Sequence, residues 1–207
     1  MASRKLPKIL SRDDAARFIR AINTKTITGL RNRVAIQLMY RCGLRVSEVC
    51  NLAPHDLYFE CDFPFIRVNE GKGDVDRVVG VDPETVELCK RWMKVRPESE
   101  WFLCAVSKGA EGNQLDERQI RDFCYRLSKK TGIYLRNGRK KQPVHPHTFR
   151  HCCATERLEE GWNLEQVKEL LGHADIQSTD IYLHVRPMVL RKKMQEIPPV
   201  GDGRPTY

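Results

Sequence analysis

The segment Tyr40-Arg-Cys-Gly-Leu-Arg-Val-Ser-Glu-Val-Cys-Asn-Leu52 lies where one apolar helical pattern ends and a second begins. Apolar side chains at helical spacing predict a helix over residues 29–42. Gly43 interrupts that helix, and a short helix opened by Arg45 is expected to fill the rest of the segment. Glu48 follows one turn later on the same face, so it either braces Arg45 or is a plain surface acid.

The rest of the chain is expected to place further helices around one small sheet. Residues 65–68 and 76–81 are typical of two strands, joined by the turn Asn69-Glu-Gly-Lys-Gly-Asp74. A basic stretch over 136–143 is expected to be a loop. Because strands and helices do not alternate, the pattern favours a mainly α protein with a small antiparallel β-sheet over a doubly wound fold. The further helices are predicted over 11–21, 83–95, 115–130, 146–160, 164–171, 175–185 and 187–196.

Length and composition indicate a single globular domain. The 207 residues are 41% hydrophobic and 30% charged, a balance typical of globular proteins. Residues 1–197 are expected to form the domain, and 198–207 a disordered tail. No apolar run approaches the roughly 20 residues that span a bilayer, and the N-terminus lacks the apolar core of a signal peptide. The sequence therefore predicts a cytoplasmic location and no membrane partner.

Charge and cysteine content narrow the functional classes. A net charge of +9 favours a polyanionic partner such as nucleic acid, although many basic proteins merely have basic surfaces. The eight cysteines include no Cys-x-x-Cys pair, which argues against a zinc ribbon or a thioredoxin-type site. Cys89 and Cys124 fall on apolar helix faces, so we expect buried, reduced thiols.

Several basic residues are of the types that phosphodiester chemistry requires. A DNA phosphate is anionic and gains charge on its oxygens in the transition state, so catalysis depends on positioning and fixed positive charge. The planar guanidinium of arginine binds two phosphate oxygens at once and stays protonated. A nucleophile and a proton donor for the leaving oxygen complete the set.

Two of the cationic candidates have plainer explanations when taken alone. Arg45 could be one of many exposed helical arginines. Lys72 lies between Gly71 and Gly73 at the predicted hairpin tip, where glycines let a ligand approach the backbone, but taken alone the residue is better explained as a solvated turn lysine. The Gly-x-x-x-x-Gly-Lys-Ser/Thr spacing of a phosphate-binding loop is absent.

A group of histidines and an arginine opens the helix predicted over 146–160. His147 and Arg150 are one turn apart and share a face. His147 and His151 have the spacing of paired metal ligands, but Thr148 stands where the metalloprotease pattern requires glutamate, and zinc needs three or four ligands. No metal ion and no cofactor are therefore expected.

A histidine and a tyrosine near the C-terminus complete the candidates. His173 follows a predicted helix end and could simply cap it. Tyr182 lies nine residues further along, and a helical tyrosine is usually part of a core. Tyr40 belongs to an apolar pattern, which favours a core position. Tyr125 and Tyr134 have no adjacent catalytic candidate, and Tyr207 lies in the expected tail.

Taken together, the candidates form a series that closely resembles the catalytic domain of the tyrosine recombinases, also called phage-type integrases. The resemblance extends over about residues 6–195, and the combined motif is highly specific although each piece is not. The most similar parts are the segment 40–52, His147-Thr-Phe-Arg-His151, and Leu170-Leu-Gly-His-Ala174 through Tyr182. The ordered candidates are Arg45, Lys72, His147, Arg150, His173 and Tyr182.

The resemblance implies a role for each of these residues. The two arginines would clamp the scissile phosphate, and the two histidines would hydrogen-bond its oxygens, with His147 also helping to move the tyrosine proton. Lys72 would act as general acid toward the leaving 5′ oxygen. Tyr182 would attack, giving a 3′-phosphotyrosyl link that is rejoined without ATP or a metal. Because a tyrosine with a pKa of ~10 is mostly neutral at physiological pH, it needs nearby cations or a base.

The resemblance also implies partners and leaves alternatives. The partner would be double-stranded DNA, bound by a homotetramer that exchanges a C-terminal helix, for which 187–196 is the candidate; without DNA the chain could be a monomer. Most family members carry an additional N-terminal core-binding domain, which is expected to be absent here. The alternatives are a type IB topoisomerase-like relaxation activity and a DNA-binding module that no longer cleaves. The basic loop could contact phosphates or simply be solvated.

Overall fold

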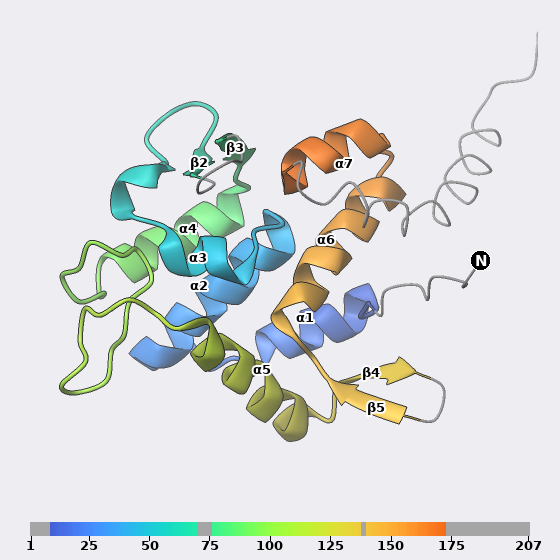
Figure 1. Cartoon of the computed structure of the whole chain (residues 1–207), viewed down its shortest axis with the longest axis horizontal. Helices are drawn as coiled ribbons and strands as arrows, with labels where there is room; N and C mark the ends of the chain where they lie inside the picture. The colour runs from blue at the N-terminus through green and yellow to red at the C-terminus, as the bar shows by residue number, and fades with distance from the viewer. Residues whose placement is uncertain (1–8, 70–75, 138–139, 173–207) are drawn as a thin grey trace, which may run out of the picture.

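The computed structural model describes residues 9–69, 76–137 and 140–172 (Figure 1). Within these ranges the chain is mainly helical with small antiparallel sheets, which confirms the predicted class. The tip of the expected hairpin, the helices expected over 175–185 and 187–196, and the expected tail lie outside the described residues.

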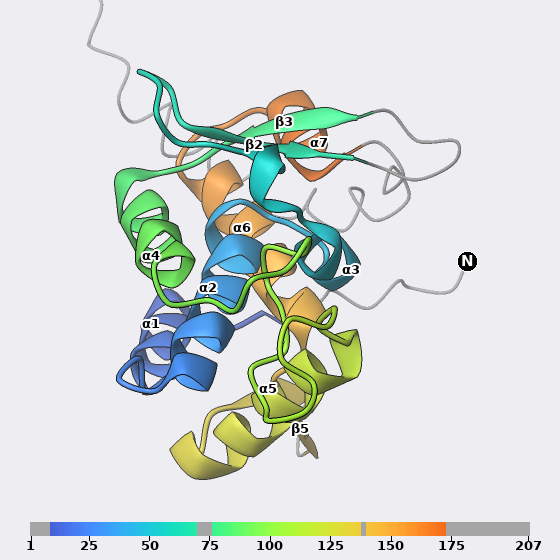
Figure 2. The same ribbon diagram turned by 90° about the vertical axis from the view of Figure 1, so that its left-hand side faces the viewer.

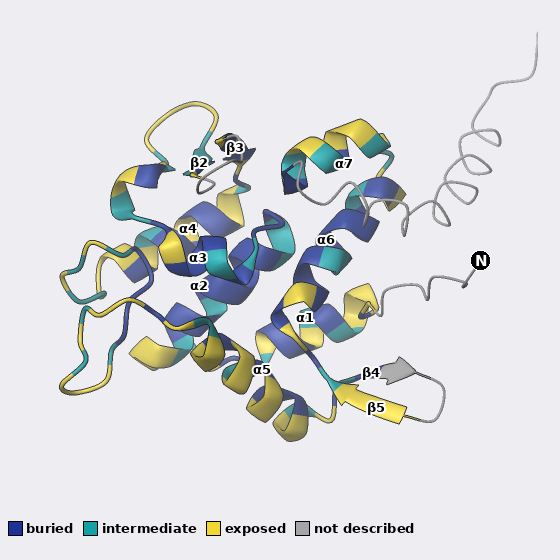
Figure 3. Cartoon of the chain, viewed as in Figure 1, coloured by how far each residue is buried: buried dark blue, intermediate teal, exposed yellow. Residues whose placement is uncertain are grey.

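Helix α2 (Ile27–Arg41) is the centre of the fold. Between Leu30 and Met39 it is buried on nearly all sides, as the dark colouring in Figure 3 shows. A helix with buried residues on every face needs neighbouring elements packed against every face. It is covered by helices from both halves of the chain, namely α1 (Arg12–Arg20), α3 (Val46–Asn51), α4 (Pro83–Met93), α5 (Glu117–Thr131) and α6 (Pro146–Glu159).

Side-chain caps fix where the first helices start. The Ser11 hydroxyl accepts a hydrogen bond from the Asp14 N–H at 3.1 Å, as the sequence predicts. The Thr26 hydroxyl accepts one from the Gly29 N–H at 3.1 Å. Because Thr26 satisfies an N–H of the first turn, α2 begins at Ile27, two residues before the predicted start.

A small sheet lies against α3 and α7 (Leu164–Leu171). Its strand order is β1 (Leu57–Tyr58), β2 (Phe65–Val68), β3 (Arg77–Gly80), all antiparallel. A short 3-10 helix, η1 (Pro54–Asp56), leads into β1. The predicted pair of strands is confirmed, and β1 was not predicted. Figure 2 shows β2 and β3 beside α7 at one end of the molecule, with α5 at the other.

The prediction of a loop over 136–143 is wrong. The chain forms a second sheet there, a hairpin of β4 (Tyr134–Asn137) and β5 (Lys140–Pro143). Its base is held by buried Leu135 and by the Val144 N–H, which donates to the Ser128 hydroxyl at 2.8 Å. The strands lack the alternating apolar pattern of a half-buried sheet, because β5 is exposed on both faces (Figure 3).

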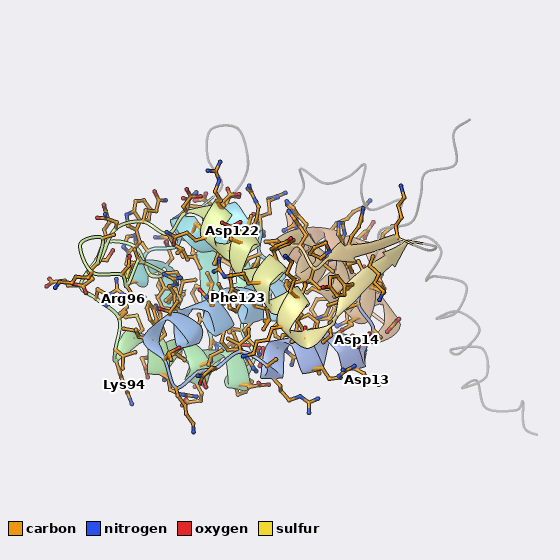
Figure 4. All side chains as sticks on the ribbon, turned by 90° about the horizontal axis from the view of Figure 1, so that it is seen from below. Asp13, Asp14, Lys94, Arg96, Asp122 and Phe123 are labelled. Atoms are coloured by element: carbon orange, nitrogen blue, oxygen red, sulfur yellow. The ribbon has the colours of Figure 1, made fainter. Side chains whose placement is uncertain are left out.

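One main core and one smaller cluster hold these elements together. In the main core, Phe18 and Phe149 pack with ring centroids 5.6 Å apart and so join α1 to α6. The smaller cluster joins α6 to α7 through Ala154, Leu158, Val167 and Leu171. Phe123 of α5, labelled in Figure 4, packs at the edge of the main core. Among the described residues, no helix combines the length and the apolar character that crossing a membrane requires.

The cysteines are buried free thiols, with Cys61 the exposed exception. Burial raises the pKa of the Cys50, Cys124 and Cys152 thiols to about 12. Since the thiolate is the reactive form, a disulfide reagent at mildly alkaline pH should titrate one thiol rapidly in the native protein and eight in denaturant. Cys61→Ser should remove the rapid phase, and rapid reaction of several native thiols would contradict the burial.

Candidate active site

Arg45 is the N-terminal cap residue of α3, and Glu48 holds it in place. The Arg45 Nη1 lies 2.7 Å from the Glu48 Oε1, and the Arg45 backbone N–H donates to the Glu48 Oε2 at 2.7 Å. Glu48 is buried, with 9% of its surface exposed. Of the two interpretations that the sequence allows, the bracing acid is therefore confirmed and the surface acid is wrong.

Glu48 is also contacted by two further arginines. The Arg77 Nη1 donates to the Glu48 Oε1 at 3.0 Å, and the Arg77 Nη2 donates to the Oε2 at 2.8 Å. The Arg150 Nη1 lies 3.9 Å from the Glu48 Oε2. We call these four residues the Glu48 cluster: Arg45, Glu48, Arg77 and Arg150. Three guanidinium groups face one carboxylate, so the cluster has a surplus of positive charge, as an anion-binding centre requires.

The charge state of Glu48 follows from its neighbours. Burial raises the pKa of the carboxyl, but the hydrogen bonds and charge of Arg77, the Arg45 N–H and the charge of Arg150 outweigh burial and hold the pKa below its usual value. Glu48 is therefore ionised at neutral pH and accepts hydrogen bonds with both oxygens.

Two members of the Glu48 cluster also bind the C-terminal end of α7. The Arg150 Nη2 donates to the Leu171 carbonyl at 2.6 Å, and the Arg77 Nε donates to the Leu170 carbonyl at 3.1 Å. The last carbonyls of a helix have no partner within the helix and carry partial negative charge. The arginines supply those partners and so fix α7 against α6 and β3.

Gly43 connects the turn before α3 to Arg150. Its carbonyl accepts a hydrogen bond from the Arg150 Nη1 at 2.6 Å. Its backbone has φ +67, and a Cβ at this position would lie 2.7 Å from the Leu171 Cδ2. Only glycine adopts this conformation without strain and leaves room for α7. The interruption seen in the sequence is therefore the contact point between α2, α6 and α7.

His147 lies in the first turn of α6, one turn before Arg150. It is exposed, whereas Arg150 is buried. The His145 ring stacks on the His147 ring with centroids 5.3 Å apart. Burial, His147 and Arg121 lower the pKa of His145. Within the described ranges, no group of three or more His, Cys, Asp or Glu side chains is placed to hold a metal ion.

Tyr40 packs against the core, as predicted. Its hydroxyl donates to the Glu156 Oε1 at 2.6 Å, and burial together with this bond raises the pKa of Tyr40. A phenol that holds its proton so tightly is a poor nucleophile, which removes Tyr40 from the candidates on chemical grounds.

Sequence reasoning missed Arg77. The strand pattern did contain a signal, because Arg77 alternates with Val79 and Val81 on the buried side of β3. A charged residue at a core-facing position requires a buried partner, but nothing in the strand itself identifies that partner as Glu48.

One known protein family matches most of the chain. The family model described as "Phage integrase family" matches residues 8–188. The chain belongs to the phage integrase family, the tyrosine recombinases. It is 35% identical over 184 residues to tyrosine recombinase XerC of Corynebacterium glutamicum, covering 88% of this chain and 56% of that protein. It is 33% identical to tyrosine recombinase XerA of Thermococcus kodakarensis, covering 93% and 64% respectively.

Solved recombinases have the same fold. The crystal structure of XerA recombinase superposes with a TM-score of 0.74 at 30% identity and covers 96% of this chain and 68% of that one. XerH site-specific recombinase bound to a palindromic difH substrate after cleavage gives 0.72 at 25% identity, covering 92% and 53%. The chain spans less than two thirds of the length of the two curated recombinases named above.

In this tyrosine recombinase family member, the structure brings together two of the predicted site residues and positions a third. Arg45 and Arg150 meet at Glu48, and His147 lies on the same helix as Arg150. The remaining predicted site residues lie outside the described residues: Lys72, His173 and Tyr182.

Proposed function

We propose that this chain carries the catalytic centre of a site-specific DNA recombinase, which cleaves and rejoins double-stranded DNA through a 3′-phosphotyrosyl intermediate. The observation that supports it most directly is the Glu48 cluster, in which Arg45 and Arg150 come from distant parts of the chain to one buried carboxylate. The membership of the phage integrase family gives the cluster its chemical context.

In this proposal Arg45 and Arg150 clamp the scissile phosphate. Both guanidinium groups are held by the protein itself, through Glu48 and the Gly43 and Leu171 carbonyls. Donors that are fixed before the reaction need no reorganisation when charge develops on the phosphate, which makes their stabilisation of the transition state large. The guanidinium of arginine presents its five N–H donors in a planar fork, a geometry that matches the oxygens of a phosphate.

The remaining roles complete the reaction. Tyr182 attacks the phosphorus and displaces the 5′ oxygen, and Lys72 donates the proton that this oxygen needs. His147 takes up the proton that the Tyr182 hydroxyl loses, and His147 and His173 donate hydrogen bonds to the non-bridging oxygens. Lys72 lies between β2 and β3 in the sequence, and His173 follows Gly172 directly, so both are joined to elements that the Glu48 cluster holds.

We further propose that DNA lies along the exposed side of α5 and the β4–β5 hairpin. Arg121 is close enough to His145 to lower its pKa, which links this side of α5 to the start of α6. Lys129 lies over the Tyr125 ring at 4.5 Å, and both residues are exposed. Each phosphate that a basic side chain neutralises strengthens binding in a salt-dependent way. The exposed basic residues of this face are Arg118, Arg121, Arg126, Lys129, Lys130, Lys140 and Lys141.

We propose that four copies of this chain assemble on DNA and that each copy exchanges the segment 187–196 with a neighbouring copy. The relative XerH is a recombinase in complex with difH DNA after cleavage, which supports binding and cutting of double-stranded DNA by a chain of this fold.

Trapping of the covalent intermediate tests the proposed function. Nicked duplexes carrying a randomised half-site lose the short 5′-hydroxyl strand on cleavage, so the intermediate cannot be rejoined. We expect the wild-type protein to form an adduct that survives detergent, and mass spectrometry should find the DNA on the peptide containing Tyr182. Tyr182→Phe should form none, whereas Tyr58→Phe, at an exposed tyrosine of β1 outside the proposed DNA-binding face, should behave as wild type.

Two outcomes would contradict this proposal. The wild type would trap nothing across the whole pool, or Tyr182→Phe would trap as much as the wild type. Relaxation of supercoiled plasmid without recombinant products would instead favour the topoisomerase-like alternative.

A further inference from the structure

We propose that Arg77 is a positioning residue for DNA cleavage, which orients the Glu48 carboxylate and through it the Arg45 guanidinium. The inference rests on the proposed function and adds to it a residue whose role requires no contact with DNA. Arg77 is buried, with 9% of its surface exposed, and each of its three guanidinium nitrogens donates to an oxygen of the protein.

The contacts of Arg77 fix both oxygens of Glu48. Arg77 Nη1 and Nη2 each donate to a different carboxylate oxygen, at 3.0 and 2.8 Å. This two-point contact sets the plane of the carboxylate as well as its position. The Oε1 that Arg77 holds is also the oxygen that lies 2.7 Å from the Arg45 Nη1. A rotation of the Glu48 carboxylate would therefore move Arg45.

The Arg77 guanidinium is itself fixed from a third side. Its Nε donates to the Leu170 carbonyl at the end of α7, at 3.1 Å. Its backbone is held by pairing of β3 with Val68 of β2. The guanidinium therefore has one orientation. α7 and β3 position Arg77, Arg77 positions the Glu48 carboxylate, and Glu48 positions Arg45.

Lysine cannot reproduce this arrangement. Its ammonium group is a point charge, whereas the planar guanidinium presents its donors in a rigid fork. The Arg77→Lys variant would keep a positive charge beside Glu48, but its ammonium group could not hold both oxygens and the Leu170 carbonyl at once. Arg77→Lys thus separates the charge of residue 77 from its geometry.

The test compares Arg77→Lys with wild type in single-turnover adduct formation, DNA binding and thermal unfolding. We expect cleavage about a hundredfold slower, because a small misplacement of a catalytic group has an effect of this size. The Kd for DNA and the far-UV circular dichroism should stay near wild type. Arg67→Lys is the matched control, since Arg67 of the adjacent strand β2 pairs with Asp56 of η1 and does not belong to the Glu48 cluster. This variant should cleave normally.

A rate equal to wild type for Arg77→Lys, or a loss of rate fully explained by weaker DNA binding or by unfolding, would overturn the inference. These results differ from failure of the proposed function itself. If the wild type forms no adduct, the proposed function and this inference fall together; if the wild type forms the adduct and Arg77→Lys matches it, only the role of Arg77 falls.

A second comparison applies even if Arg77→Lys folds poorly. If Arg77 acts through Glu48, the double variant Glu48→Gln, Arg77→Gln should cleave at a rate within about twofold of that of Glu48→Gln alone. The two changes disrupt the same set of contacts, so their effects do not add. If the double variant instead lost rate by the product of the two single losses, Arg77 would act independently of Glu48, and the inference would be overturned.

Discussion

Arg150→Ala should lower the rate of DNA cleavage by about a thousandfold, the loss expected when one fixed donor to the transition state is removed. The change removes a proposed phosphate clamp. It also removes the bonds at 2.6 Å to the Gly43 and Leu171 carbonyls, which hold the turn before α3 and the end of α7. Single-turnover adduct formation on saturating DNA measures this rate without the contribution of binding.

A charge-preserving change sharpens this prediction. Arg150→Lys should still cleave at least about tenfold slower than wild type, because lysine lacks the fork that reaches two carbonyls and a phosphate. Arg157→Ala is the control on the same helix, since Arg157 pairs with Glu160 and stacks on Trp162 outside the Glu48 cluster. Wild-type rates for Arg150→Lys would show that charge alone is needed and that the geometry described for Arg150 is irrelevant.

Glu48→Gln should lower the free energy of unfolding at neutral pH by about 3 kcal/mol, the cost of removing one partner from a buried ion pair. The carboxylate is 7% exposed and faces three arginines, whose charges would lose their compensation. Urea unfolding followed by circular dichroism measures the difference. Glu84→Gln is the matched control at the surface, 69% exposed beside Arg33, and should change stability by less than about 1 kcal/mol.

The pH dependence of this difference has a defined sign. The folded protein holds the pKa of Glu48 below its usual value of 4.5. The stabilisation by the carboxylate is therefore fully present above the unfolded pKa and is lost as the pH falls through the folded pKa. The difference between wild type and Glu48→Gln should shrink from about pH 4.5 downward. A difference that grows in acid would contradict the assignment of Glu48 as the ionised centre of the cluster.

Most of the helices and the main strand pair could be predicted because their signals are local. The Ser11 cap, the glycine at position 43 and the apolar spacing of α5 each act over a few residues, so the sequence contains the whole signal. The hairpin over Tyr134–Pro143 could not be predicted in this way. Its strands are mostly polar, and the buried contacts at its base depend on Ser128 of a separate helix.

The same division applies to the active site. The sequence alone determined which residue types occur, in which order, and hence the family, because arginine, histidine and tyrosine have their chemistry wherever they lie. Only the tertiary structure decided that Glu48 is a buried centre and that Arg77 belongs to it. Arg77 is 29 residues from Glu48, and its other partner, Leu170, is 93 residues away. Such pairings depend on how α3, β3, α6 and α7 pack together, since a buried charge is stable only where packing delivers its partner.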